Sequence, residues 1–114
     1  MVNPGPYVPQ RGDVVWITLN PQAGHEQAGR RPAVILSPQA YNAKVGLALL
    51  CPITSQAKDY PFEVAIPEGL PVAGVILSDH IKSLDWRARN AEWVCSLPPL
   101  ITAEVLVKSQ TLLT

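Results

Sequence analysis

The sequence predicts a mainly β (α+β) fold: a small antiparallel barrel with short helices and a helix at its C-terminus. Twelve prolines in 114 residues disfavour long helices over most of the chain. Short stretches rich in β-branched and aromatic residues lie between the prolines, a pattern that is typical of strands. The tail, residues 102–113, contains neither proline nor glycine and predicts the helix. Many short strands followed by one helix indicate a single barrel domain over residues 1–114.

The N-terminal half predicts three strands and one helical turn. The first strand follows a turn, and the polar segment after it contains two glycines and is predicted as a loop. The second strand is apolar throughout and is therefore expected at the centre of the sheet. Ser37 is expected to cap the helical turn, with Pro38 at the first helical position. In order, the elements are the strand Val14–Leu19, the loop 20–31, the strand Ala33–Leu36, the helical turn 37–44 and the strand Leu47–Ile53.

The C-terminal half predicts four short strands and the terminal helix. The first of these strands alternates apolar and polar residues, as a strand with one buried face does. Thr102 is expected to cap the helix. The buried side of the helix is expected to carry Val105, Leu106, Leu112 and Leu113. The four strands are Phe62–Ile66, Gly74–Leu77, Ile81–Arg87 and Trp93–Ser96.

Charge and composition exclude some classes of protein. Lys plus Arg and Asp plus Glu number nine each, so this is no basic protein that coats long nucleic acid. Its cations gather locally, in Arg30, Arg31, Lys82, Arg87 and Arg89, which would suffice for a few nucleotides. No apolar run approaches the roughly 20 residues of a membrane-spanning helix, and the N-terminus lacks the apolar stretch of a signal peptide. We therefore expect a cytoplasmic protein without membrane contact.

The cysteines and histidines predict neither a disulfide nor a metal site. Cys51 and Cys95 lie far apart in the sequence, and we expect them to be reduced thiols in or near the core. The two histidines and two cysteines show no ligand spacing such as C-x-x-C. We expect no metal and no other cofactor.

The densest group of chemically active side chains lies between Gly24 and Arg31. It holds the imidazole of His25, the carboxylate of Glu26 and the guanidinium groups of Arg30 and Arg31. RNA cleavage by transesterification needs a base for the 2′-hydroxyl, a cation at the phosphorus and a proton for the departing 5′-oxygen. Glu26 could supply the base, and Arg31 could clamp the phosphate through its rigid fork of donors. From composition alone, a solvated charged loop explains the same residues.

Two further groups of polar side chains follow predicted strands. Thr54, Ser55 and Gln56 come at the end of one strand, where a hydroxyl could reach a phosphate, although such residues are also common in strand-end turns. Asp79 and His80 are adjacent, which invites comparison with a hydrolase triad. Adjacent side chains of a strand point to opposite faces, so we do not expect these two to pair.

Four motifs, taken in their order along the chain, resemble the MazF/PemK family of toxin–antitoxin ribonucleases. The resemblance runs from about Tyr7 to Arg89 and covers most of the chain. The motifs are Gly12-Asp13-Val14, Gly24-x-Glu26-Gln27-x-Gly29-x-Arg31-Pro32-Ala33, Tyr60-Pro61-Phe62-Glu63-Val64 and Asp79-x-Ile81-Lys82-Ser83-x-Asp85-Trp86-Arg87.

The resemblance implies an SH3-like barrel that forms a homodimer and cleaves single-stranded mRNA without a metal. Cleavage would leave a 2′,3′-cyclic or 3′-phosphate and a 5′-hydroxyl, and an acidic MazE-like antitoxin would be the partner. Carried over by position, the resemblance assigns catalysis to Glu26, Arg31 and Thr54, and antitoxin binding to exposed rings of Trp16 and Trp86. The residues that it implies in RNA binding are His25, Gln27, Arg30, Ser55, Gln56, Lys82 and Ser83.

The stretch from Ile81 to Arg89 resembles that of family members that cut at ACA. Its Lys82 and Ser83 supply hydrogen-bond donors, while Asp79 and Asp85 could accept from the exocyclic amines of A and C. A domain of this size can read only a few unpaired bases. We therefore expect a recognition site of three or four bases that contains ACA.

Two other functions suit a small barrel. A non-catalytic SH3-like barrel that acts by binding protein, as a gyrase poison does, would be expected to lack the pair of Glu26 and Arg31. A plain RNA-binding module would need several exposed aromatic residues for base stacking, whereas this chain has one Phe and three Tyr. The endoribonuclease is the function that the sequence favours.

Overall fold

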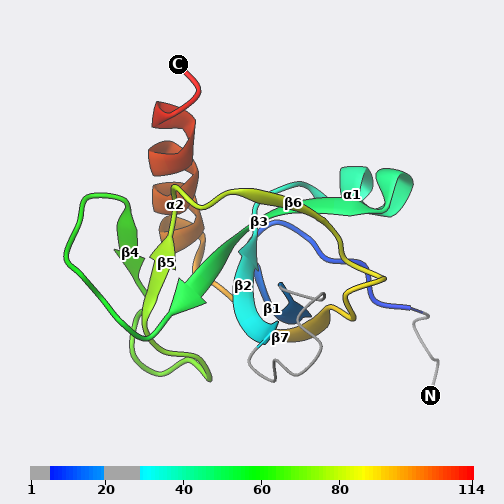
Figure 1. The fold of residues 1–114 in the computed structure, drawn as a ribbon, viewed down its shortest axis with the longest axis horizontal. Helices are drawn as coiled ribbons and strands as arrows, with labels where there is room; N and C mark the ends of the chain where they lie inside the picture. The colour runs from blue at the N-terminus through cyan, green and yellow to red at the C-terminus, as the bar shows by residue number, and fades with distance from the viewer. Residues whose placement is uncertain (1–5, 20–28) are drawn as a thin grey trace.

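A computed structural model of the chain describes residues 6–19 and 29–114, which form a mainly antiparallel sheet with two helices (Figure 1). The mainly β (α+β) prediction is confirmed. The strands are β1 (Asp13–Thr18), β2 (Arg30–Ile35), β3 (Leu47–Thr54), β4 (Glu63–Ala65), β5 (Val75–Leu77), β6 (Lys82–Asp85) and β7 (Glu92–Ser96), and the helices are α1 (Gln39–Val45) and α2 (Pro99–Thr111).

The sheet is strongly curved but does not close by hydrogen bonding. Its strand order is β4-β5-β3-β2-β1-β7, and β6 pairs separately with β3. Within the described ranges, β4 and β7 stand at the two ends and do not pair with each other, so the barrel is open between them. The long strand β3 produces this branching because β6 pairs with its first half and β5 with its end.

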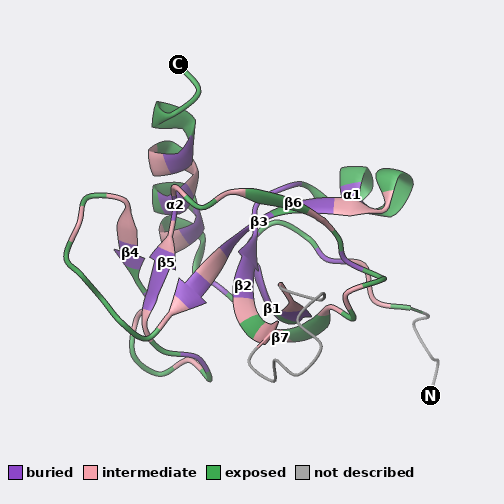
Figure 2. Ribbon diagram, viewed as in Figure 1, coloured by how far each residue is buried: buried purple, intermediate pink, exposed green. Residues whose placement is uncertain are grey.

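Buried apolar residues lie on both faces of the sheet, which explains the apolar runs in its central strands (Figure 2). One face packs in a cluster with α2 that includes Val14, Val34, Cys51, Ile53 and Val105. Alternate residues of the same strands build the second cluster, which comprises Val15, Ile17, Ala33, Ile35, Ala48, Leu50 and Trp86. The second face is the one that extends toward the candidate site.

The strand β2 begins earlier than the sequence predicts. Arg30 and Arg31 pair with Thr18 and Ile17 of β1, so both arginines belong to the sheet and not to the loop that precedes it. This pairing fixes the backbone of Arg31 and directs its side chain to the face of Ile17.

Both helices begin without the side-chain caps that the sequence predicts. Pro38 takes the N-cap position of α1, and the hydroxyl of Ser37 instead donates to Oδ1 of Asn42. Pro98 takes the N-cap position of α2, which begins at Pro99, so Thr102 lies inside the helix. A proline at the first helical position suits a helix start because its missing N–H would have no partner there.

The last turn of α2 departs from its predicted burial. Val105 is fully buried and Leu106 is partly buried, as expected. Leu112 and Leu113, by contrast, are exposed, because the helix runs past the sheet and its C-terminal end projects from the molecule (Figure 2). No helix of the described residues is long and apolar enough to cross a membrane.

Candidate active site

Arg31 and Thr54 leave the sheet at the same edge. The ladder between β2 and β3 ends at the pair Ala33–Pro52, and each of the two residues lies two positions beyond this pair on its own strand. Pairing partners in an antiparallel ladder share a face, so both side chains belong to the face of Ala33. Arg31 is exposed, and Thr54 is half-buried with its Oγ1 accepting the backbone N–H of Gln56 at 3.2 Å.

Gly74 sets the backbone of Thr54. Its φ of +120° lies in the region that favours glycine, and an added Cβ would stand 2.2 Å from the carbonyl oxygen of Thr54. This distance is far shorter than a van der Waals contact, so a side chain at position 74 would displace the end of β3. The position of Thr54 therefore depends on a residue twenty positions further along the chain.

A polar pocket of about 440 Å³ lies beside Thr54. It brings together the strand-end group, the Tyr60-Pro61-Phe62-Glu63-Val64 motif and the group around Asp79, which are separate in the sequence. The residues that line it are Thr54, Gln56, Lys58, Tyr60, Glu63, Leu77, Asp79 and His80. Tyr60 and Lys58 are absent from the residues that the sequence assigns to the site, although the Tyr60-Pro61 motif was a usable signal.

Hydrogen bonds shape the wall of this pocket. The carboxylate of Glu63 accepts the backbone N–H groups of Lys58 at 2.9 Å and of Asp59 at 3.0 Å, which holds the turn before β4. Tyr60 donates its hydroxyl to Oδ1 of Asp79 at 2.6 Å, and this bond raises the pKa of Tyr60 to about 12. The phenol therefore stays protonated and acts as a donor at neutral pH.

Asp79 and His80 lie closer together than the sequence predicts. They follow β5 in a turn, not in a strand, and Nε2 of His80 lies 3.8 Å from Oδ1 of Asp79. Both line the polar pocket. The expectation that the two side chains point to opposite faces is wrong because it assumed strand geometry.

The two β6 residues assigned to RNA binding point to opposite faces of the sheet. Lys82 pairs with Leu50 and shares the face of Arg31, whereas Ser83 pairs with Leu49 and faces the other side. Lys82 is exposed. Ser55 and Gln56 are exposed beside the polar pocket, at the end of β3.

Arg30, which the resemblance assigns to RNA binding, is hydrogen-bonded within the protein. Its guanidinium donates to the carbonyl oxygens of Asn90 at 2.5 Å and of Arg89 at 3.3 Å, and it forms an ion pair with Glu92. These bonds join the start of β2 to the turn before β7. Arg30 therefore holds the sheet edge beside Arg31 and has little donor capacity left for a phosphate.

One of the three tryptophans is not placed as the sequence predicts. Trp16 is 42% exposed, in accord with a contact surface, but Trp86 is only 3% exposed. The indole N–H of Trp86 donates to the carbonyl oxygen of Asn42 at 3.0 Å, and the Arg87 guanidinium lies 4.7 Å from the ring centroid. The expectation of an exposed ring at Trp86 is therefore wrong. The next tryptophan along the chain, Trp93, is the exposed one, with 55% of its surface in contact with solvent.

Three assigned residues, Glu26, His25 and Gln27, lie outside the described residues, as does most of the predicted loop that carries them. Both cysteines are free and buried, as predicted, and burial raises the pKa of the Cys51 thiol to about 12. Within residues 6–19 and 29–114, no group of three or more His, Cys, Asp and Glu is arranged to hold a metal ion.

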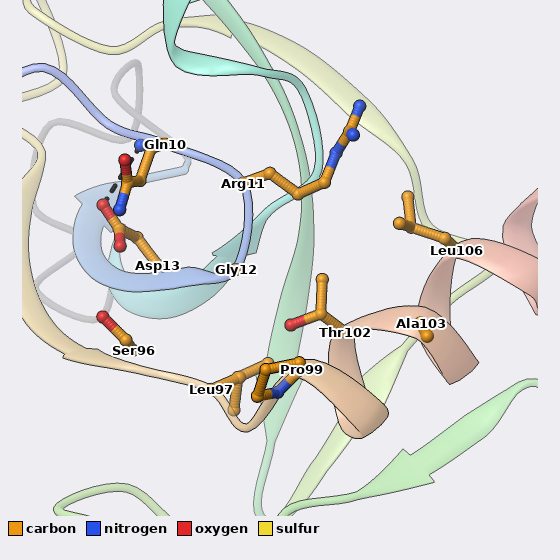
Figure 3. Close-up of a pocket in the computed structure, with 10 residues that line it drawn as sticks. All are labelled: Gln10, Arg11, Gly12, Asp13, Ser96, Leu97, Pro99, Thr102, Ala103 and Leu106. Carbon is orange, nitrogen blue, oxygen red and sulfur yellow. Dashed lines mark hydrogen bonds between the residues drawn. The ribbon is translucent and has the colours of Figure 1, made fainter.

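A second cavity, of about 340 Å³, lies between the turn before β1 and the first turns of α2 (Figure 3). Asp13 sits beside it and accepts the N–H of Gln10 at 3.1 Å, while Arg11 points away from it toward the carbonyl oxygen of Leu36. Oγ1 of Thr102 is buried and finds no hydrogen-bond partner among the described residues. This cavity holds no cation aimed inward, so it offers nothing for phosphate chemistry.

Known proteins resemble the chain over nearly its whole length. The family model "PemK-like, MazF-like toxin of type II toxin-antitoxin system" matches residues 10–113. The chain is 53% identical over 85 residues to the protein named endoribonuclease toxin MazF of Escherichia coli strain K12, covering 75% of this chain and 76% of that protein. It is 35% identical to endoribonuclease PemK of Escherichia coli, covering 92% and 82% of the two chains.

Crystal structures share the fold. MazF from Deinococcus radiodurans matches with a TM-score of 0.87 and 56% identity, covering 95% of this chain and 98% of that one. A MazE-MazF crystal structure from the same organism matches with a TM-score of 0.85 and 49% identity, covering 95% and 97%. The match to the family model, the identities and the placement of Arg31 and Thr54 lead to one conclusion: the chain belongs to the PemK-like, MazF-like toxin family of type II toxin–antitoxin systems.

Proposed function

We propose that the chain is the toxin of a toxin–antitoxin pair, an endoribonuclease that cuts single-stranded mRNA and so stops translation and growth. The observation that carries the proposal is the shared edge of Arg31 and Thr54, beside a polar pocket that is large enough for a nucleotide base. Relatives that cover most of the chain are named endoribonucleases, which supports the same activity. RNA and antitoxin both occur in the cytoplasm, where we place the protein.

Arg31 stabilises the charge that develops on the phosphate. Its exposed guanidinium presents paired donors at the sheet edge, and its backbone is held by the pairing with Ile17. Such a preorganised cation acts on the transition state because charge accumulates there on the non-bridging oxygens. Arg31 would be a poor proton donor, because a guanidinium keeps its proton in proteins.

Glu26 and Thr54 complete the proposed reaction. Glu26 takes the proton from the 2′-hydroxyl, and the resulting oxyanion attacks the phosphorus. The bond to the 5′-oxygen breaks as this oxygen takes a proton from solvent water, and Glu26 afterwards returns its proton to the solvent. This sequence leaves a 2′,3′-cyclic phosphate and a 5′-hydroxyl, and it needs no metal. The hydroxyl of Thr54 lies on the same face as Arg31 and contacts the phosphate or the leaving oxygen.

The polar pocket reads a base beside the cut. Asp79 is an acceptor for an exocyclic amine, and the hydrogen bond from Tyr60 holds its carboxylate in place. Adenine and cytosine carry such amines, which supports the expectation of a site of three or four bases containing ACA. Mapping the cut sites on a long unstructured RNA tests both the ribonuclease activity and the recognition sequence. The absence of cutting would contradict the proposed activity, whereas cutting at a consensus without ACA would contradict only the proposed specificity.

An apolar groove of about 630 Å³ supports the proposed homodimer. It lies on the opposite side of β3 from Arg31 and is lined mainly by apolar side chains, among them Tyr41, Leu49, Ile81, Leu106 and Leu113. Tyr41 and Leu49 are each 39% exposed, and a second copy would remove these rings and methyl groups from water. Leu49→Glu should convert the dimer to a monomer in sedimentation equilibrium.

The proposed antitoxin binds over Trp16. The ring is 42% exposed on β1, and a neutral protein attracts an acidic chain only in patches, so an apolar anchor should contribute most of the affinity. Relatives crystallised as MazE-MazF complexes support a partner of this kind. The alternative of a non-catalytic barrel that poisons a protein target would leave RNA intact in the mapping experiment.

A further inference from the structure

Trp93 is an exposed aromatic residue that the proposed reaction does not use. It lies on β7, which pairs with β1 on one side and, in the described part of the chain, with no strand on the other. With 55% of its surface exposed, it leaves a large flat apolar ring in water at the edge of the sheet. Such a ring costs solvation free energy unless a ligand covers it.

Trp93 shares a face of the sheet with Arg31. It pairs with Val15, and Arg31 pairs with Ile17, two residues further along the same strand β1. Residues that alternate along a strand point to one side, so Trp93, Val15, Ile17 and Arg31 all face the same way. From the strand spacing and rise, the Cα atoms of Trp93 and Arg31 are on the order of 12 Å apart.

A pocket of about 560 Å³ lies against the Trp93 ring. Its other walls come from the segment before β1, from the first residue of β1, from the last residue of β7 and from α1. The polar residues among them are Tyr7, Gln10, Asp13, Gln39 and Ser96. The carboxylate of Asp13 is positioned by the hydroxyl of Tyr7 at 2.5 Å and by the N–H of Gln10 at 3.1 Å. The pocket thus combines one flat aromatic wall with several hydrogen-bonding groups.

Two carboxylates lie beside Trp93, and both have partners within the protein: Asp13 is buried and accepts hydrogen bonds from Tyr7 and Gln10. Glu92 precedes Trp93 on β7, and its carboxylate is paired with the guanidinium of Arg30. The same arginine donates to carbonyl oxygens in the turn before β7 and so connects that turn to β2. Arg30 therefore prepares this edge for RNA by neutralising an acid, not by contacting a phosphate.

We propose that Trp93 is a stacking platform for one unpaired nucleobase that flanks the cut site, with the polar groups of its pocket meeting the edge of that base. The inference rests on the proposed ribonuclease function and adds a contact remote from the catalytic edge. Single-stranded RNA is bound by stacking bases on aromatic side chains, and each stacked base contributes about 1–3 kcal/mol. A protein partner is less favoured here because the face of Trp93 is the face of Arg31, whereas Trp16 points to the opposite side.

The test compares variants of Trp93 on one short RNA of the mapped recognition sequence. Trp93→Ala should raise KM about tenfold with little change in kcat, which is the size expected for one stacked base. Trp93→Phe keeps a flat ring and should retain most of the affinity, while Trp93→Leu keeps apolar volume without a ring and should not. Leu100→Ala, at a residue 84% exposed on α2, is the matched control and should behave as wild type.

A series of RNAs with one abasic nucleotide at each flanking position identifies the partner base. An abasic nucleotide at one position should raise the KM of the wild type as much as Trp93→Ala does. When the variant is tested on that abasic RNA, the KM should rise no further than with either change alone. Additive losses at every position, an unchanged KM in Trp93→Ala, or equal KM values for the Leu and Phe variants would overturn the proposal. A Trp93→Ala variant that loses only antitoxin affinity would also overturn it, in favour of a protein-docking surface. Failure of the wild type to cut RNA would instead remove the proposed function.

Discussion

Tyr60 and Asp79 connect the two ends of the β4–β5 hairpin at the rim of the polar pocket. The phenol of Tyr60 precedes β4, the carboxylate of Asp79 follows β5, and the hydrogen bond between them spans 2.6 Å. Both residues stand near Thr54, which lines the same pocket. A contact between hairpin ends thus also sets the orientation of a carboxylate that faces the proposed substrate.

This contact predicts an alkaline titration that belongs to Tyr60. Its pKa is raised from 10.0 to about 12, first by the hydrogen bond to Asp79, so the protonated phenol is favoured in the folded state. The stabilisation is fully present below a pH of about 10, the unfolded pKa, and is lost as the pH rises toward about 12. The difference in phenolate absorbance between wild type and Tyr60→Phe should show this late step, and Asp79→Asn should move it back toward 10.0. A step at the ordinary value in the wild type would contradict the bond.

Arg31→Ala should abolish cleavage without unfolding the protein. The side chain is exposed and acts on the phosphate, so its loss removes transition-state stabilisation of about 3 kcal/mol, a hundredfold or more in rate. Initial rates on a short RNA and the thermal midpoint give the two readouts. A folded variant with near-normal rates would remove Arg31 from the reaction.

Arg30→Ala is the matched comparison and should show the reverse profile. It deprives the carbonyl oxygens of Arg89 and Asn90 of a donor and leaves Glu92 unpaired, so the thermal midpoint should fall. The rate per folded molecule should fall far less than in Arg31→Ala. Equal losses of rate in the two variants would restore Arg30 as a residue that contacts RNA.

Cleavage should continue in excess EDTA and stop on an RNA whose cut site lacks the 2′-hydroxyl. The nucleophile in the proposed reaction belongs to the substrate, and Arg31 supplies the cation at the phosphorus. A 2′-deoxy nucleotide at the cut position removes that nucleophile without changing the base. Cutting of the modified RNA would indicate attack by water and a different set of catalytic residues.

Asn42→Ala should destabilise the protein by about 2–4 kcal/mol, because it breaks a fully buried network. The Asn42 amide donates to the carbonyl oxygens of Pro9 at 2.8 Å and of Ser37 at 3.1 Å, and its Oδ1 accepts the hydroxyl of Ser37. Chemical denaturation measures the change, with the exposed Lys44→Ala on the same helix as control. A loss equal to that of the control would show that the network contributes little.

Trp16→Ala should weaken antitoxin binding while leaving RNA cleavage by the free protein intact. The exposed ring loses its apolar contact, and such an anchor contributes about 2 kcal/mol or more when it lies at the centre of an interface. Titration calorimetry with the antitoxin or its C-terminal peptide measures the loss. Trp86→Ala is unsuitable for this test, because removal of a buried indole would destabilise the core. Unchanged affinity in Trp16→Ala would show that the antitoxin binds elsewhere.

The sequence predicted the type and order of the elements better than it predicted how polar side chains are used. β-Branched residues and prolines act on the backbone conformation of their own segment, so the seven strands occur in the predicted order and close to the predicted positions. The predicted cap of α1 failed because the Ser37 hydroxyl has other partners: it donates to Oδ1 of Asn42 and accepts the backbone N–H of Leu49. The predicted cap of α2 failed because the helix begins at Pro99, ahead of Thr102. The start of α2 was readable, since Pro99 suits the first helical position.

The site was predicted in part for similar reasons. The motifs indicated Arg31 and Thr54 as site residues, and the structure brings both to one edge of the sheet. A motif does not distinguish an arginine that faces the substrate from one, such as Arg30, that is hydrogen-bonded within the protein. Trp86 was expected to be exposed but is buried, and Trp93 is exposed instead. A ring's burial depends on which strands and loops pack against it, and a local sequence pattern does not contain that information. Tyr60 joins the pocket through a partner nineteen positions away, which local patterns do not encode.

Gly74 has a consequence for how such a gene would vary in a growing population. Any coding change at this position adds at least a Cβ, which would collide with the carbonyl oxygen of Thr54. If the free toxin arrests growth, cells that inherit such a change survive, and the codon becomes a frequent route of escape although it encodes no reactive group. Sequencing the survivors of toxin expression without antitoxin should therefore recover substitutions of Gly74 alongside those of Arg31.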